Sequence, residues 1–220
     1  MLKVVTLMLA AALTLPAAII FSENFENGVA IQAQTTGVLQ GTQFRMVSGS
    51  IDIVTPTSPY ASNCTAPTTG TCIDTTGGGT LGRGTIETIN EIYLAPGEYF
   101  LSFDLIGWYY SVTNLAKEAS VRVTFGDLFD QVYVRNGNNN PYPTINELLV
   151  VDEATSARLV FQTLTGPAYA GVILDNIEIR TAFEENVAHA PEPGTWALIA
   201  LGGGLLALQR MRRRQAAQVA

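Results

Sequence analysis

The sequence predicts an all-β protein: an antiparallel two-sheet sandwich, preceded by a signal peptide and followed by a short transmembrane helix. Two observations favour this fold class. Apolar and polar residues alternate over many short segments, and turn residues separate these segments. Charged residues make up only 14% of the 220 residues, while Gly and Pro number 20 and 10. Many short strands at this spacing are typical of two packed sheets whose inward faces build one core.

Residues 1–22 have the pattern of a secretory signal peptide. Lys3 supplies a positive start, residues 4–15 are apolar except for two threonines, and Pro16 interrupts the helix before two small alanines. This run is too short to span a membrane comfortably. The alternative is that it forms a buried strand or helix of the domain. We expect a leader, which places the body of the protein outside the cytoplasm.

Residues 23–182 form the predicted sandwich domain. The clearest strand covers residues 97–105, in which every second side chain is apolar and defines a buried face. The same period of two recurs in residues 119–125. Further strands are predicted at residues 128–134, 147–151, 157–164 and 172–179, with Gly, Pro, Asn and Asp marking the turns.

Residues 55–84 are rich in Thr, Pro, Gly and Ser, and we expect a long loop there. Cys64 and Cys72 lie in this segment, and a leader makes a disulfide between them the natural expectation. Closing the nine-residue loop would stabilise the fold by about 2.5 kcal/mol in the chain-entropy description. Two free thiols are the alternative. Metal binding is not expected, because no histidine or third cysteine lies nearby.

Residues 183–190 form a predicted linker, and residues 191–214 form a tail of three parts. An apolar segment within residues 195–209 contains 13 strictly apolar residues, about 20 Å of helix against roughly 30 Å of hydrocarbon. Such a short segment favours transient insertion over a permanent anchor. A proline motif precedes this segment and a basic cluster follows it: Pro191, Glu192 and Pro193, then Arg210, Arg212, Arg213 and Arg214.

This tail closely resembles the PEP-CTERM sorting signal of Gram-negative bacteria. The resemblance covers residues 191–214 and rests on the Pro-Glu-Pro motif, the single apolar helix and the basic end, in that order. It implies recognition by an exosortase-type sorting enzyme while the tail is transiently anchored in the inner membrane. It also implies display on the cell envelope or in the extracellular matrix of a biofilm that contains exopolysaccharide. The alternative is a plain C-terminal anchor.

The body resembles galactose-binding-like jelly rolls and carbohydrate-binding modules. The resemblance implies a structural calcium ion where the first and last strands meet, with Glu26 and Asp175 as its ligands and Glu23, Asp52 and Asp74 as poorer candidates. Ca²⁺ takes six to eight oxygens, which two carboxylates and main-chain carbonyls can supply. The alternative is that Glu26 caps a turn while Asp175 faces solvent or accepts hydrogen bonds from main-chain amides. The segments that carry the resemblance are residues 23–28, 47–53, 72–74, 94–105 and 171–179.

A glycan site needs an exposed aromatic ring surrounded by polar groups, because sugars stack their apolar faces on rings. Trp108, Tyr109 and Tyr110 follow the strand at residues 97–105 and are the candidate platform. Packing of Trp108 in the core is the alternative, since most aromatic residues of sandwiches are buried.

The sequence does not predict an enzyme. The single histidine, His189, lies in the linker, and no G-x-S-x-G or phosphate-binding motif is present. Without the leader and the tail, the chain has 7 basic and 18 acidic residues, a net charge of about −11, which disfavours nucleic acid as a partner. We expect an exported envelope or matrix protein with a structural or adhesive sandwich. The alternative is a carbohydrate-binding module that engages exopolysaccharide.

Overall fold

The computed structural model describes residues 17–59, 61–64, 70–78, 82–107, 118–136, 144–166 and 171–182. The linker, the tail and most of the leader predicted from the sequence lie outside these ranges. Among the described residues, no helix is long and apolar enough to cross a bilayer.

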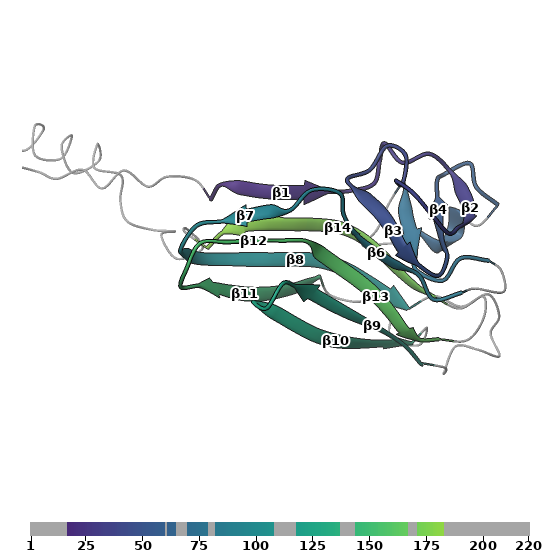
Figure 1. The fold of residues 1–220 in the computed structure, drawn as a ribbon. Coiled ribbons are helices and arrows are strands. Elements are labelled where there is room, and N and C mark those ends of the chain that lie inside the picture. Colours follow the sequence, from purple (N-terminus) through teal and green to yellow (C-terminus); the bar gives the residue numbers. More distant parts are fainter. Residues whose placement is uncertain are drawn as a thin grey trace, which may run out of the picture. The chain divides into compact units, whose positions relative to one another are not determined.

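The described residues form two antiparallel sheets that stack face to face (Figure 1). The seven-stranded sheet contains, in order, β11 (Ile145–Val151), β8 (Gly97–Gly107), β14 (Val172–Thr181), β5 (Cys72–Asp74), β4 (Ile51–Val54) and β2 (Ile31–Gln34), and β1 (Ile19–Glu23) pairs with β14. The five-stranded sheet contains, in order, β10 (Phe129–Asn136), β9 (Glu118–Phe125), β13 (Leu159–Thr165), β6 (Thr85–Thr88) and β3 (Phe44–Ser48). Two short strands, β7 (Ile92–Leu94) and β12 (Thr155–Ala157), pair with each other, and one 3-10 helix covers Ala61–Asn63. The predicted all-β sandwich is confirmed.

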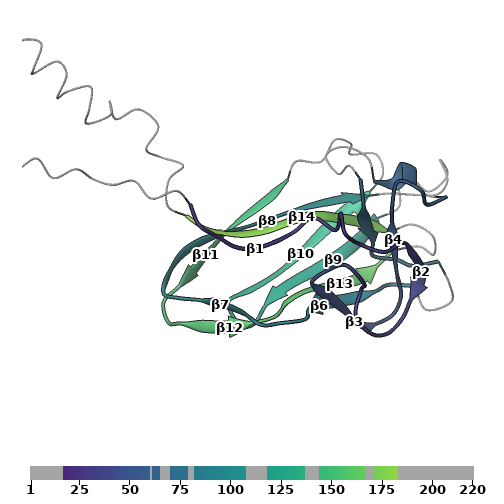
Figure 2. The same ribbon diagram turned by 90° about the horizontal axis from the view of Figure 1, so that it is seen from above.

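The core lies between the two sheets, which Figure 2 shows as separate layers. Phe103 of β8 meets Phe161 of β13 edge to face, with ring centroids 5.4 Å apart. Phe161 in turn contacts Phe44 of β3 at 6.1 Å. All three rings are at most 2% exposed. Edge-to-face contacts of this kind add to the stabilisation from buried apolar area and hold the two sheets against each other.

The sandwich begins earlier than the boundary at residue 23 that the sequence suggested. Strand β1 includes residues assigned to the leader, and its Phe21 lies opposite Ile179 of β14 and is 9% exposed. Ala18 extends this pairing, since its N–H donates to the hydroxyl of Thr181 at 2.9 Å. The sequence boundary was wrong because the first residues of β1 are as apolar as the leader that precedes them, so hydropathy does not separate the two.

The expected long loop at residues 55–84 contains a central strand. β5 pairs with β14 on one side and β4 on the other, and all three of its residues are buried. Apart from β5 and the 3-10 helix, the described residues of this segment are in turns and loops. A strand of three residues is too short to show a period of two, and the surrounding threonines and glycines mask it.

Candidate functional site

The first strand ends in a turn that a buried glutamate stabilises. Glu23 is 8% exposed, and its carboxylate oxygens accept hydrogen bonds from the main-chain N–H groups of Phe25 and Gln43, at 2.8 and 2.7 Å. Phe25 has a φ of 56°, a left-handed conformation that bulky residues rarely adopt. Because the Phe25 ring is fully buried and the next side chain, Glu26, is exposed, the turn directs Glu26 away from the core.

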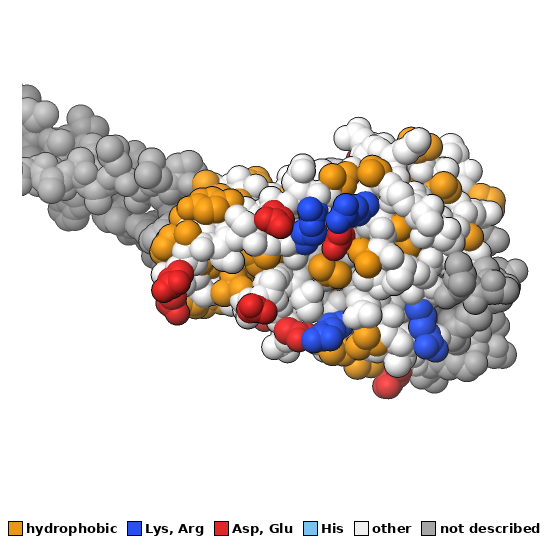
Figure 3. Space-filling view, viewed as in Figure 1, with side chains coloured by type: hydrophobic (Ala, Val, Ile, Leu, Met, Phe, Trp, Pro, Cys, Tyr) orange, Lys and Arg blue, Asp and Glu red, His pale blue; other side chains and the backbone are white. Residues whose placement is uncertain are grey.

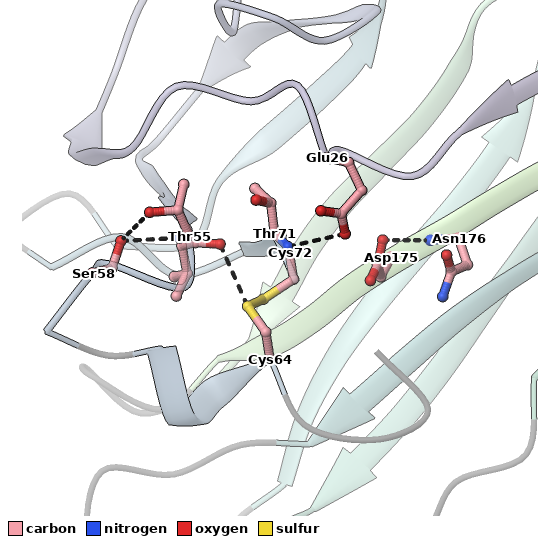
Figure 4. Close-up of a disulfide and its surroundings, with 9 residues drawn as sticks. Glu26, Thr55, Ser58, Cys64, Thr71, Cys72, Asp175 and Asn176 are labelled. Carbon is pink, nitrogen blue, oxygen red and sulfur yellow. Dashed lines mark hydrogen bonds between the residues drawn. A yellow bond between two sulfur atoms is a disulfide. The ribbon is translucent and has the colours of Figure 1, made fainter. Parts of the chain in front are cut away.

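Glu26 and Asp175 lie beside each other where this turn meets β14. In Figure 4 their carboxyl groups point toward one another. Oε1 of Glu26 accepts a hydrogen bond from the N–H of Thr71 at 3.1 Å, and Oδ1 of Asp175 accepts one from the N–H of Asn176 at 2.7 Å. The structure therefore brings together the two carboxylates that the sequence singled out.

Asp104 adds another carboxylate, because it lies directly opposite Asp175 in the register of β8 and β14. It accepts hydrogen bonds from the hydroxyl of Thr144 at 2.6 Å and from Nδ2 of Asn176 at 2.8 Å. We call Glu23, Glu26, Asp104 and Asp175 the acidic cluster. Burial raises the pKa of Asp175 to about 7, and the negative charges of the other three members add to this shift.

The acidic cluster offers oxygen atoms of the kind that Ca²⁺ prefers, and a cation would relieve the repulsion between its members. However, no group of three or more His, Cys, Asp or Glu side chains within the described ranges is arranged to hold a metal ion. Main-chain carbonyls or water would have to supply most of the six to eight oxygens. Calcium binding at Glu26 and Asp175 therefore stays a prediction.

Asp52 and Asp74 form a separate pair, opposite each other on β4 and β5. Burial raises the pKa of Asp74 to about 7, and the charge of Asp52 adds to the shift, while hydrogen bonds from the N–H and hydroxyl of Thr76 oppose it. Asp52 and Asp74 are 7% and 4% exposed. Carboxylates with raised pKa values can serve as general acids, but this pair has little contact with solvent, which favours a structural role.

The predicted disulfide between Cys64 and Cys72 is present, with Cα atoms 5.7 Å apart. It ties β5 to the segment that contains the 3-10 helix. Figure 4 shows that it lies close to the acidic cluster, since Thr71, the donor to Glu26, directly precedes Cys72. The disulfide thus helps to position one member of the cluster.

A pocket of about 380 Å³ lies between β1 and the β6–β7 connection. Tyr93 lies at this pocket and is 61% exposed, the one exposed aromatic ring among the described residues. Thr42, Gln43, Asn90 and Glu91 contribute a hydroxyl, two amides and a carboxylate to its walls. An exposed ring beside several polar groups suits a ligand with both an apolar face and hydrogen-bonding groups.

The aromatic residues that the sequence suggested as a platform, Trp108, Tyr109 and Tyr110, lie outside the described residues, as do the sorting motif and the tail arginines. Tyr93 was missed. Its signal is present in the sequence, because its neighbours Ile92 and Leu94 are buried on the alternate positions of β7. Period-two alternation over three residues is easily overlooked.

No family model and no curated protein matches the chain in sequence. Similar solved structures include the CBM22-1 xylan-binding domain of Xyn10C from Paenibacillus barcinonensis, with a TM-score of 0.45, 13% identity, and coverage of 76% of this chain and 97% of that one. A cyclase from Fischerella sp. in its apo form has a TM-score of 0.42, 13% identity, and coverage of 77% and 98%. The K3 cleaved adhesin domain of Lys-gingipain from Porphyromonas gingivalis has a TM-score of 0.40, 12% identity, and coverage of 74% and 98%. None of these similarities assigns the chain to a family.

Proposed function

We propose that the sandwich is a non-catalytic carbohydrate-binding module and that the pocket beside Tyr93 is one of its sugar subsites. The exposed ring of Tyr93 carries this proposal. A sugar ring presents an apolar face that stacks on an aromatic side chain, while its hydroxyl groups bond to amides and carboxylates at the rim. Asn90, Gln43 and Glu91 supply such groups around Tyr93.

Binding without catalysis fits the placement of the titratable groups. The carboxyl groups whose pKa values are raised by burial, Asp52, Asp74 and Asp175, are at most 7% exposed. None of them lines the pocket beside Tyr93. A glycosidase needs two carboxyl groups on either side of an accessible scissile bond, and buried groups do not meet that need.

The proposed cellular setting is outside the cytoplasm. The Cys64–Cys72 disulfide is typical of oxidising compartments. We propose that a leader exports the chain and that residues 191–214 act as a PEP-CTERM signal for an exosortase-type enzyme in the membrane. The natural ligand would then be a polysaccharide of the cell surface or the surrounding matrix.

Glycan binding by the purified protein tests the proposal. On a glycan array, we expect discrete hits that Tyr93→Ala weakens by about tenfold or more, which corresponds to about 1.4 kcal/mol. Tyr93→Phe keeps the ring and should retain most of the binding. Val132→Ala, at an exposed site on the five-stranded sheet, is the matched control. An array without hits, or hits that Tyr93→Ala leaves unchanged, would contradict the proposal.

A further inference from the structure

A second pocket, of about 410 Å³, lies at the C-terminal end of β1. Its walls are rich in side-chain amides and carboxylates, which are groups that bond sugar hydroxyls and amines. The lining residues of this kind are Asn24, Asn27, Gln43, Asn176 and Glu178, together with the buried Glu23, whose two oxygens already accept main-chain hydrogen bonds.

Gln43 lines both pockets and joins them across β1. Its Nε2 donates to the main-chain carbonyl of Ser22 at 2.6 Å, and its main-chain N–H donates to Oε2 of Glu23 at 2.7 Å. These two contacts fix Gln43 against β1. From β1, Ile20 and Phe21 line one pocket while Ser22 and Glu23 line the other, so the pockets adjoin along the strand. A ligand that filled both pockets, of about 380 and 410 Å³, would be an oligosaccharide and not a single sugar.

The two pockets are acidic. Neither contains a Lys or Arg among its described lining residues, whereas Glu23, Glu91 and Glu178 line them. Glu26 and Asp175 directly precede Asn27 and Asn176, which line the second pocket. Burial raises the pKa of Asp175 to about 7, and the charges of Asp104, Glu26 and Glu23 add to this shift. Arg180 pairs with Glu178 at 3.4 Å and lies over the Phe100 ring at 5.2 Å, so it offsets the charge of Glu178 but does not line the pocket that contains Glu91.

Resting on the proposed carbohydrate-binding function, we infer that the two pockets form one continuous strip across β1 that selects chains of amino sugars over neutral chains and excludes chains of uronic acids. An ammonium group on the sugar is attracted to Glu91, while a carboxylate is repelled. Opposite charges near a protein surface attract each other, and salt weakens the attraction. The preference is therefore electrostatic, and the stacking on Tyr93 is shared by all chains.

Three oligosaccharides of equal length test the selectivity by calorimetric titration of the purified protein: glucosamine, N-acetylglucosamine and galacturonic acid oligomers. We expect the glucosamine oligomer to bind about tenfold more tightly than its acetylated counterpart at low ionic strength. High salt should remove this advantage, and galacturonate should show no binding. Glu91→Gln should reduce the advantage several-fold. The matched control is Glu153→Gln, at an exposed position in the turn between β11 and β12.

Chain length tests the continuity of the strip. A longer glucosamine oligomer should bind more tightly than a disaccharide, and Asn24→Ala should remove this gain while leaving disaccharide binding at the Tyr93 pocket unchanged. Asn24 is exposed, but its Oδ1 accepts a hydrogen bond from the N–H of Glu26 at 3.3 Å, so an unfolding temperature equal to that of the wild type is the control for Asn24→Ala. A disaccharide that binds as tightly as the longer chain would overturn the continuous strip.

The outcomes separate the two proposals. If amino, neutral and acidic chains bind alike, or galacturonate binds best, while Tyr93→Ala still weakens binding, the charge selectivity is overturned and the carbohydrate-binding function stands. If none of the oligosaccharides binds and the glycan array is also without hits, both proposals fall.

Discussion

Asp74 is a carboxyl group surrounded by protein, and its protonation is coupled to folding. Its folded-state pKa of about 7 lies above the ordinary 3.8, and Asp175 behaves in the same way. Between these two pH values the folded state binds more protons than the unfolded state, so protonation stabilises the fold below about pH 4 and this contribution is lost as the pH rises through 7. Stability should therefore decrease from acidic to neutral pH.

Asp74→Asn tests this coupling. Asparagine keeps an oxygen that can accept the hydrogen bonds from Thr76 but carries no ionisable proton. We expect the variant to unfold at a higher temperature than the wild type above pH 7, with a gain of no more than about 4 kcal/mol, and to lose part of the pH dependence. Thermal unfolding across the pH range measures this. Asp152→Asn, at an exposed site, is the control, and an unchanged profile in Asp74→Asn would contradict the assignment.

Calcium binding would favour the charged form of Asp175, whereas burial favours its protonated form. If Ca²⁺ binds at Glu26 and Asp175, adding it above pH 7 should raise the unfolding temperature, because it neutralises charges that repel one another. A calcium concentration of 100 times Kd would stabilise the fold by about 2.7 kcal/mol. Calorimetric titration should show heat that Glu26→Ala abolishes. The absence of both heat and stabilisation in the wild type would refute the prediction.

At the scale of single elements, long strands were predictable and short ones were not. The buried face of β8, with Tyr99, Leu101, Phe103 and Leu105, was correctly identified by its period of two. Strand β5 and the first residues of β1 were missed, because their strand character depends on pairing with β14 and not on a local pattern. The same limit applies to the site. Glu26 and Asp175 were identified through resemblance, whereas the approach of Gln43 to β1 depends on a contact across 21 positions in the chain.

Strand β1 supplies the next prediction. A chain that begins at Ala18 keeps Phe21 in the core, where it contacts Phe44 at 6.1 Å, and keeps Glu23 in its turn. A chain that begins at Asn24 loses both. We expect the longer chain to fold normally and the shorter one to lose on the order of 3 kcal/mol or more, comparable with truncation of a buried phenylalanine. Denaturant unfolding of the two chains measures this, and equal stability would show that β1 is dispensable.

At the scale of the whole sandwich, the charges of the two sides differ. On the face of the five-stranded sheet, positive and negative side chains lie next to each other (Figure 3). Glu87 pairs with Arg45 and approaches Arg158 at 3.9 Å, and Arg122 pairs with Asp130. The acidic cluster beside β1 has no comparable set of cations among the described residues. The described face of the five-stranded sheet is therefore balanced in charge and offers an anionic polymer no uniformly positive surface.

Truncation of the C-terminal tail tests where the whole protein is sorted. If residues 191–214 are a sorting signal, removing residues 191–220 should change where the protein accumulates, while the sandwich keeps its fold and its disulfide. In a host that contains an exosortase, we expect the complete chain in the envelope fraction or the matrix and the shortened chain in the periplasm or the medium. Replacing Pro191 and Pro193 by alanine should reproduce the shortened chain's distribution, because prolines keep the recognition peptide extended. Alanine at the exposed Glu153 is the control. Identical fractionation of all four chains would refute the sorting role of the tail, whereas the proposed glycan-binding surface beside β1 does not depend on that role.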